Sequence, residues 1–303
     1  MIKKYKFGNP IETDAVIEKM EIDSSKIHSI EVRDGIFNIS MNEKTRVYGL
    51  GEANRGINKR GFKYVSYCTD DPSHTEEKES LYGAHNFIMF DNGEEIFGLF
   101  FDNPGRVTFD IGYTEKNKAV ITPEFNDMYV YYIEENNIES VIKEFRKIIG
   151  MSYIAPKWAF GFGQSRWSYE NKDRVDSVVK GYEDNNMLIS SIYMDIDYME
   201  EYKDFTVNNE RFPEFTKYVK QLKEKGIRLV PIIDAGVKIE KGYDIYEEGV
   251  ANNYFVKDEK ENEIIVSDEH CCCSFSRRLF FPHGSFQTIV KVFWQCLSHC
   301  RWG

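Results

Sequence analysis

The sequence predicts an N-terminal β-sandwich followed by a parallel α/β domain. Aromatic and β-branched runs separated by turns fill residues 1 to about 136, a helical pattern begins at residue 138, and strands then alternate with helices. A chain of 303 residues, of which 42% are hydrophobic and 29% charged, is long enough for two such domains.

The first segment contains several strand-like runs. They are VYGLGE (47–52), LYGAHNFIMF (81–90) and EIFGLFFDNPGRVTFDIGY (95–113). Asp91, Asn92 and Gly93 separate two of these runs, and this triplet favours a tight hairpin turn. Many short strands at regular spacing, with no helix between them, are typical of a sandwich.

A helix marks the start of the second pattern. Apolar residues recur at helical spacing over residues 138–149, and Gly150 follows as a stop. The elements expected after it are strands at 158–164, 190–197 and 227–236 and helices at 171–184 and 213–226. Strands joined through helices run parallel, which leaves an open doubly wound sheet or a (β/α)8 barrel.

The net charge and the lack of long apolar segments make several classes of partner less favoured. The formal net charge of −11 argues against nucleic acid or an anionic membrane as partner and makes phosphorylated substrates less favoured. Residues 1–16 lack the apolar core of a signal peptide, and no run reaches the length of a membrane span. We therefore expect a soluble, cytoplasmic protein.

Polar chemistry follows each of the three expected parallel strands. It comprises the segment Gln164–Trp167, the pair Asp195 and Asp197, and Asp234. In both parallel architectures, ligands bind at the carboxyl ends of the strands. This agreement predicts a binding site at that edge of the sheet.

The IYMDIDYM segment (192–199) allows three interpretations. Strand alternation predicts that Asp195 and Asp197 share one face with Tyr193. The two acids could be solvated strand-end residues or could pair with Arg166 or Lys203. They could form the DxD metal site of a nucleotide-sugar glycosyltransferase, or a sugar-binding pair in a glycoside hydrolase barrel.

An ordered set of motifs resembles one family. YGLGE (48–52), LYGAHNF (81–87), PKWAFGFGQSRWSY (156–169), IYMDIDYM, KDFT (203–206) and PIIDAGV (231–237) occur in this order. Together they resemble the α-glucosidases of glycoside hydrolase family 31, with the nearest likeness to bacterial enzymes of gut Firmicutes.

The resemblance implies a fold and an activity. The fold is a galactose-mutarotase-like β-sandwich followed by a (β/α)8 TIM barrel, here truncated after the first three βα units. The activity is retaining hydrolysis of terminal α-linked glucose in maltose- and isomaltose-type oligosaccharides, without a metal or organic cofactor. The intact enzyme could be a homo-oligomer.

The resemblance also implies roles for individual residues. Asp195 matches the acid that binds hydroxyls of the terminal glucose, and Ile196 matches an apolar wall of that subsite. Trp167 matches an aromatic residue that influences linkage preference, with core packing as its alternative. Ile232 and Asp234 match positions at the floor of the pocket.

A loop acid of the first domain completes the expected site. Asp71, or less favourably Asp70, matches a carboxylate that reaches over the mouth of the barrel. A turn-forming aspartate before Pro72 is the alternative. The nucleophile and the acid/base of the family are both aspartates in later segments that this sequence lacks, so no catalytic residue is assigned here.

The last residues depart from the family. From His270 to Gly303 there is no Asp or Glu, and five of the six cysteines lie there. We expect residues 1–150 to form the sandwich, 151–266 a partial barrel, and 267–303 a disordered tail from a shifted reading frame. A zinc site is a weak alternative because the cysteine spacing is wrong. A non-catalytic carbohydrate-binding remnant is the alternative function.

Overall fold

The computed structural model describes residues 1–69, 73–233 and 237–255. The chain divides into two compact units, Met1–Ser152 and Tyr153–Gly303, and each is described by itself. Asp71 and Asp234 lie outside the described residues, as does the tail. Within the described ranges, no helix combines the length and apolar character that crossing a membrane requires.

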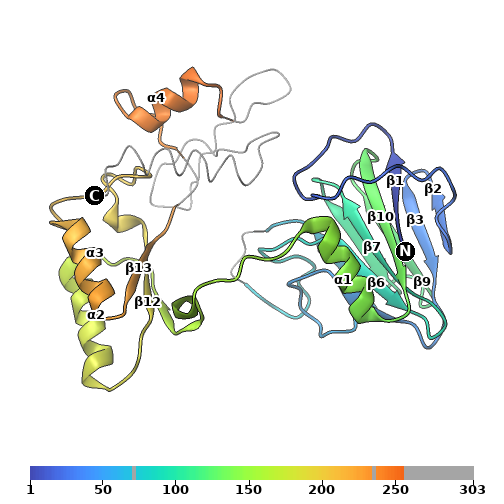
Figure 1. Cartoon of the computed structure of the whole chain (residues 1–303), viewed down its shortest axis with the longest axis horizontal. Helices are drawn as coiled ribbons and strands as arrows, with labels where there is room; N and C mark the ends of the chain where they lie inside the picture. The colour runs from blue at the N-terminus through green and yellow to red at the C-terminus, as the bar shows by residue number, and fades with distance from the viewer. Residues whose placement is uncertain (70–72, 234–236, 256–303) are drawn as a thin grey trace. The chain divides into compact units, whose positions relative to one another are not determined.

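The first unit is a sandwich of two five-stranded antiparallel sheets, which confirms the predicted class (Figure 1). The first sheet has the order β1 (Ile2–Phe7), β10 (Met128–Glu135), β7 (Ile96–Asp102), β6 (Phe87–Asp91) and β4 (Arg46–Gly49). The second has the order β2 (Ile30–Arg33), β3 (Ile36–Ser40), β9 (Lys118–Pro123), β8 (Val107–Ile111) and β5 (Phe62–Ser66).

The hairpin predicted at Asp91–Gly93 is confirmed. Strands β6 and β7 pair antiparallel with Asp91 opposite Ile96, and Gly93 has a φ of 90°. The strand predicted over 81–90 is shorter than expected, because pairing of β6 with β4 reaches only to Ile88 opposite Gly49.

Aromatic rings fill the space between the two sheets. Phe37, Phe101 and Phe109 are completely buried there. The centroid of the Phe101 ring lies 5.0 Å from that of Phe37 and 5.9 Å from that of Phe109, both in edge-to-face geometry. Such pairs add to the stabilisation that burial of apolar surface provides.

Helix α1 (Ile138–Ile149) covers the outer face of the first sheet. Val141 and Ile148 are buried in the cluster that they form with this face, and the Phe145 ring stacks on Phe87 at 3.7 Å. The Asn137 side chain caps the helix, and Gly150, with a φ of 86°, ends it. The predicted bounds of this helix are therefore confirmed.

The second unit contains a three-stranded parallel sheet, β11 (Gly163–Ser165), β12 (Ser191–Met194) and β13 (Arg228–Pro231). Its other elements are the 3-10 turns η1 (Lys157–Phe160) and η2 (Ile196–Tyr198) and the helices α2 (Lys172–Asp184), α3 (Phe215–Glu224) and α4 (Asp244–Ala251). The alternation of strands and helices is as predicted.

The strands are shorter than the sequence predicted. Residues 158–160 form the end of η1, in which Ala159 N donates to Pro156 O at 2.9 Å, so β11 begins only at Gly163. Strand β12 ends at Met194 because the next residue caps η2. Strand β11 pairs with β12 only over Gly163–Ser165, and β12 pairs with β13 only over Ser191–Met194.

Helices α2 and α3 cover one face of this sheet. Ile192 and Met194 of β12 pack in one cluster with Val175 of α2 and Leu222 of α3. Tyr193, which points to the opposite face, is 45% exposed. The strands therefore bury one face and leave the other open in the described residues.

Candidate functional site

The candidate site lies where β11 and β12 end. Asp195 directly follows β12, and its Oδ1 accepts a hydrogen bond of 2.7 Å from Ile196 N, which starts the η2 turn. The chain therefore leaves the strand before Asp195. The prediction that Asp195 and Asp197 alternate with Ile196 along one strand is wrong, because Asp195 caps a 3-10 turn that contains Ile196 and Asp197.

Asp197 is held by two side chains from other segments. Arg211 Nη1 lies 3.1 Å from Asp197 Oδ1, and Ser168 Oγ donates a hydrogen bond to Asp197 Oδ2. Only 14% of the Asp197 side chain is exposed. Both carboxylate oxygens of Asp197 thus have protein partners, and the group serves as a structural link.

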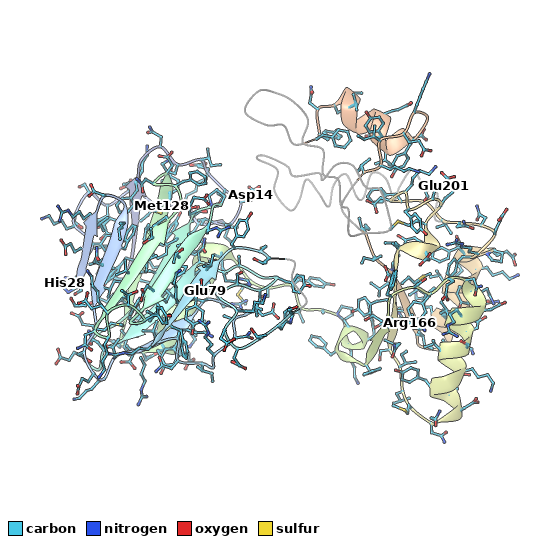
Figure 2. All side chains as sticks on the ribbon, turned by 180° about the vertical axis from the view of Figure 1, so that it is seen from behind. Asp14, His28, Glu79, Met128, Arg166 and Glu201 are labelled. Atoms are coloured by element: carbon cyan, nitrogen blue, oxygen red, sulfur yellow. The ribbon has the colours of Figure 1, made fainter. Side chains whose placement is uncertain are left out.

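The partners expected for this acid were different residues. Lys203 instead lies 3.0 Å from Glu240 and 3.3 Å from Glu201. Arg166 donates from Nε to Trp167 O at 3.2 Å. Figure 2 labels Arg166, on the segment after β11, and Glu201, on the loop after η2. The pairing hypothesis was therefore wrong about the cations, although an ion pair does form.

Asp195 keeps more capacity to accept hydrogen bonds. Among the described residues, its Oδ1 accepts from Ile196 N, and its Oδ2 accepts only a long bond of 3.4 Å from Ser168 N. Each carboxylate oxygen has two lone pairs, and the side chain is partly exposed. Asp195, and not Asp197, is therefore the carboxylate available for a hydroxylated ligand.

Trp167 lies directly before Ser168 in the chain and is 72% exposed. Core packing, which was its alternative role, is wrong for the described structure. Trp167 is thus one residue from Ser168, whose N–H donates to Asp195 Oδ2. An exposed indole suits a sugar, because the ring has a flat apolar face and one hydrogen-bond donor.

The two isoleucines behave differently. Ile196 is only 9% exposed and packs in the core beneath the helices. Ile232, just after β13, is 43% exposed. Tyr198 Oη donates to Ile232 O at 2.9 Å, which ties the residue after β13 to the η2 turn. Burial raises the pKa of the Tyr198 phenol, so this donor stays protonated at neutral pH.

The metal hypothesis has little support from this geometry. A DxD site needs carboxylate oxygens free for the cation, whereas both oxygens of Asp197 already have partners. Among the described residues, no group of three or more His, Cys, Asp or Glu side chains is placed to hold a metal ion. The cysteine-rich tail lies outside them.

Sequence reasoning missed Ser168 and Arg211. They contact Asp197 from 29 and 14 residues away, and no spacing rule connects them to the acid. The available signal was Ser168 itself, a polar residue within the segment SRWSY that follows β11.

Comparison with known proteins identifies the family. A profile of the glycosyl hydrolases family 31 TIM-barrel domain matches residues 152–293. A profile of the glycosyl hydrolase 31 N-terminal galactose mutarotase-like domain matches residues 10–110. The chain belongs to glycoside hydrolase family 31.

Individual relatives agree with this assignment. Alpha-glucosidase 2 of Bacillus thermoamyloliquefaciens is 34% identical over 218 residues, which are 72% of this chain and 28% of that protein. The alpha-glucosidase of Saccharolobus solfataricus is 29% identical over 211 residues, which are 70% of this chain and 30% of that protein.

Solved structures show the same fold. The glucose complex of the Flavobacterium johnsoniae GH31 dextranase superposes with a TM-score of 0.75 at 21% identity. The match covers 88% of this chain and 32% of the dextranase chain. The chain thus spans about a third or less of the length of these relatives.

Proposed function

We propose that this chain is the N-terminal part of a retaining α-glucosidase that releases terminal α-linked glucose from maltose- and isomaltose-type oligosaccharides. Relatives that carry the name alpha-glucosidase support the activity class. The observation that carries the proposal is an available carboxylate, Asp195, that accepts a hydrogen bond from Ser168 N, the residue directly after the exposed indole of Trp167.

In this proposal the chain binds and orients the sugar. Asp195 accepts hydrogen bonds from hydroxyls of the terminal glucose, as a carboxylate with free lone pairs can. Trp167 contacts the sugar ring and influences linkage preference, and Ile232 contributes apolar surface. Asp71 and Asp234 remain proposed contributors from outside the described residues. The buried position of Ile196 favours a supporting role beneath the site.

The chemical step requires groups that these 303 residues do not supply in this proposal. Retaining hydrolysis uses two carboxyl groups about 5 Å apart, one as nucleophile and one as acid/base. The corresponding family segments are not found in the sequence. We therefore expect the purified chain to bind oligosaccharide without cleaving it. Release of glucose from maltose or isomaltose by this chain would overturn that expectation.

Calorimetry with maltose and isomaltose tests the binding site. We expect saturable binding by the wild-type chain and at least a tenfold loss in Asp195→Asn, since the amide no longer offers two charged acceptors. Asp184→Asn is the matched control, because this acid lies on the exposed end of α2 and pairs with Lys180. Equal affinities of wild type and Asp195→Asn would contradict the site.

Non-catalytic carbohydrate binding is the second candidate function. It is favoured by the presence of the binding groups without the expected catalytic aspartates. Binding without hydrolysis, together with a gene whose reading frame ends as given, would select it.

The proposed domain boundaries are 1–150, 151–266 and 267–303. The barrel-domain match reaches residue 293, beyond the proposed barrel boundary at 266. Resequencing the gene downstream of the Val266 codon tests the shifted-frame proposal. A continuation of the family pattern in another frame would support it, and confirmation of the present frame with no such continuation would refute it.

A further inference from the structure

Ser168 contacts both acids of the candidate site. Its N–H donates to Asp195 Oδ2 at 3.4 Å, and its Oγ donates to Asp197 Oδ2. In the described part of the chain, no other residue donates hydrogen bonds to both of these carboxylates. One residue of the segment after β11 therefore joins the two acids that follow β12.

The backbone of Ser168 is strained. Its φ of 65° lies in the left-handed region, which is unfavourable for a residue with a Cβ atom. Such strain persists only where surrounding contacts stabilise it. Here the bond from the Ser168 hydroxyl to Asp197 Oδ2 and the longer bond from its N–H to Asp195 Oδ2 are contacts that can stabilise this conformation.

The reversal at Ser168 separates its two neighbours. Trp167 is 72% exposed, whereas Tyr169 is 1% exposed and packs in the core with Val175. The left-handed residue thus directs one aromatic ring outward and the next one inward. We therefore expect the orientation of the Trp167 ring to be sensitive to the backbone conformation at Ser168.

Arg211 completes the arrangement from the loop before α3. Its Nη1 contacts Asp197 Oδ1 at 3.1 Å and Asp197 O at 3.4 Å. Asp197 is therefore fixed on one side by Arg211 and on the other by Ser168. A carboxylate held in this way is a firm acceptor for the Ser168 hydroxyl.

We infer that Ser168, supported by Asp197 and Arg211, is a positioning residue that sets the placement of Asp195 and Trp167 for the ligand. This inference rests on the proposed function, because it assigns these two residues to sugar binding. It also explains why two carboxylates stand so close together. Ser168 supplies a donor to each, Arg211 offsets the charge of Asp197, and Asp195 stays available.

The test compares four variants of the whole chain by calorimetry with maltose and isomaltose. Ser168→Ala removes the hydroxyl but keeps the strained Cβ, and Ser168→Gly removes both. Arg211→Gln weakens the support of Asp197. Ser177→Ala is the matched control, because the Ser177 hydroxyl donates to Arg174 O within α2, away from the site.

We expect Ser168→Ala to weaken binding about tenfold and Ser168→Gly and Arg211→Gln about threefold or more, as loss of one charge-assisted hydrogen bond allows. Ser177→Ala should bind as wild type. Ser168→Ala should also lower the urea midpoint more than Ser177→Ala, because the Ser168 hydroxyl donates to the Asp197 carboxylate whereas the Ser177 hydroxyl donates to a carbonyl of its own helix. Wild-type affinity in both Ser168 variants would overturn the inference.

A second measurement does not depend on sugar. With 5-fluorotryptophan incorporated, the Trp167 fluorine resonance, assigned by Trp167→Phe, should move in Ser168→Ala and Arg211→Gln but stay in place in Ser177→Ala. If the wild-type chain binds neither sugar, the proposed binding function fails while this spectrum still decides the positioning role. An unmoved Trp167 resonance in both Ser168→Ala and Arg211→Gln would overturn it.

Discussion

The two units differ in how many faces of their sheets they bury. In the sandwich, the first sheet packs against the second sheet on one side and against α1 on the other. In the barrel unit, the parallel sheet packs against α2 and α3 on one side only. The face with Tyr193 stays open in the described residues. Antiparallel sheets can leave a face in water, whereas parallel sheets are normally covered on both faces.

The well-packed unit and the unit that carries the proposed site are therefore different parts of the chain. The sandwich pairs its strands in two five-stranded sheets, and its fully buried side chains include Phe37, Phe101 and Phe109. The barrel unit keeps its polar and aromatic residues at the carboxyl ends of an incomplete sheet, where a ligand can reach them. The unit that carries the proposed site is therefore the unit with less packing of its own.

The largest expected effect is a difference in resistance to proteolysis. Within the described residues, β11 and β13 are unpaired sheet edges, and Phe160, Trp167 and Tyr193 are exposed. Open edges and exposed apolar groups favour local opening. Limited proteolysis followed by mass spectrometry should cut first after residue 152 and leave a fragment close to Met1–Ser152. First cuts inside the sandwich would reverse the comparison.

A core substitution tests how tightly the sandwich is packed. Phe101→Ala should lower the free energy of unfolding by about 3–5 kcal/mol, because it leaves a cavity beneath Phe37 and Phe109. The control is Phe125→Ala at an exposed position, which should lower the free energy of unfolding by less than about 1 kcal/mol. Urea unfolding followed by circular dichroism measures both. Similar losses in the two variants would show that the space between the sheets tolerates the cavity.

Two adjacent residues of β12 sharpen the comparison within the barrel unit. Ile192→Ala should cost about 2–4 kcal/mol, because Ile192 is fully buried against the helices. Tyr193→Ala should cost less than about 1 kcal/mol, because its side chain faces the open side. Hydrogen exchange of the β12 amides reports both changes. Equal costs would mean that the open face is covered in solution.

The smallest expected effect concerns alkaline pH in the sandwich. Burial raises the pKa of Tyr64 from the ordinary tyrosine value of 10.0 to about 12, against a smaller opposing effect of Arg55. The folded state therefore retains this proton where the unfolded chain has lost it. Stability from this group is complete below pH 10 and is lost as the pH rises from 10 through about 12, by up to about 2–3 kcal/mol.

Tyr64→Phe removes this titration. Between pH 9 and pH 11 its urea midpoint should fall less than that of the wild-type chain. At pH 7 the substitution should cost little, because the buried Tyr64 hydroxyl has no hydrogen-bond partner among the described residues. Parallel midpoint curves for the two proteins would refute the assignment.

Elements with a local cause could be predicted from the sequence. The 138–149 helix follows from its apolar spacing, the Asn137 cap and Gly150. The hairpin after β6 follows from its turn residues. Strand ends could not be predicted as well. The turn capped by Pro156 delays the start of β11, and the turn capped by Asp195 ends β12.

The sequence by itself determined the two-part architecture, the family and the edge of the sheet at which ligands are expected, because these depend on periodicity and on ordered motifs. Only the tertiary structure decided which of the two neighbouring aspartates is available. That outcome depends on Ser168 and Arg211, which approach Asp197 from distant parts of the chain. Hydrogen-bond partners so far apart in sequence are chosen by folding, and no local pattern encodes them.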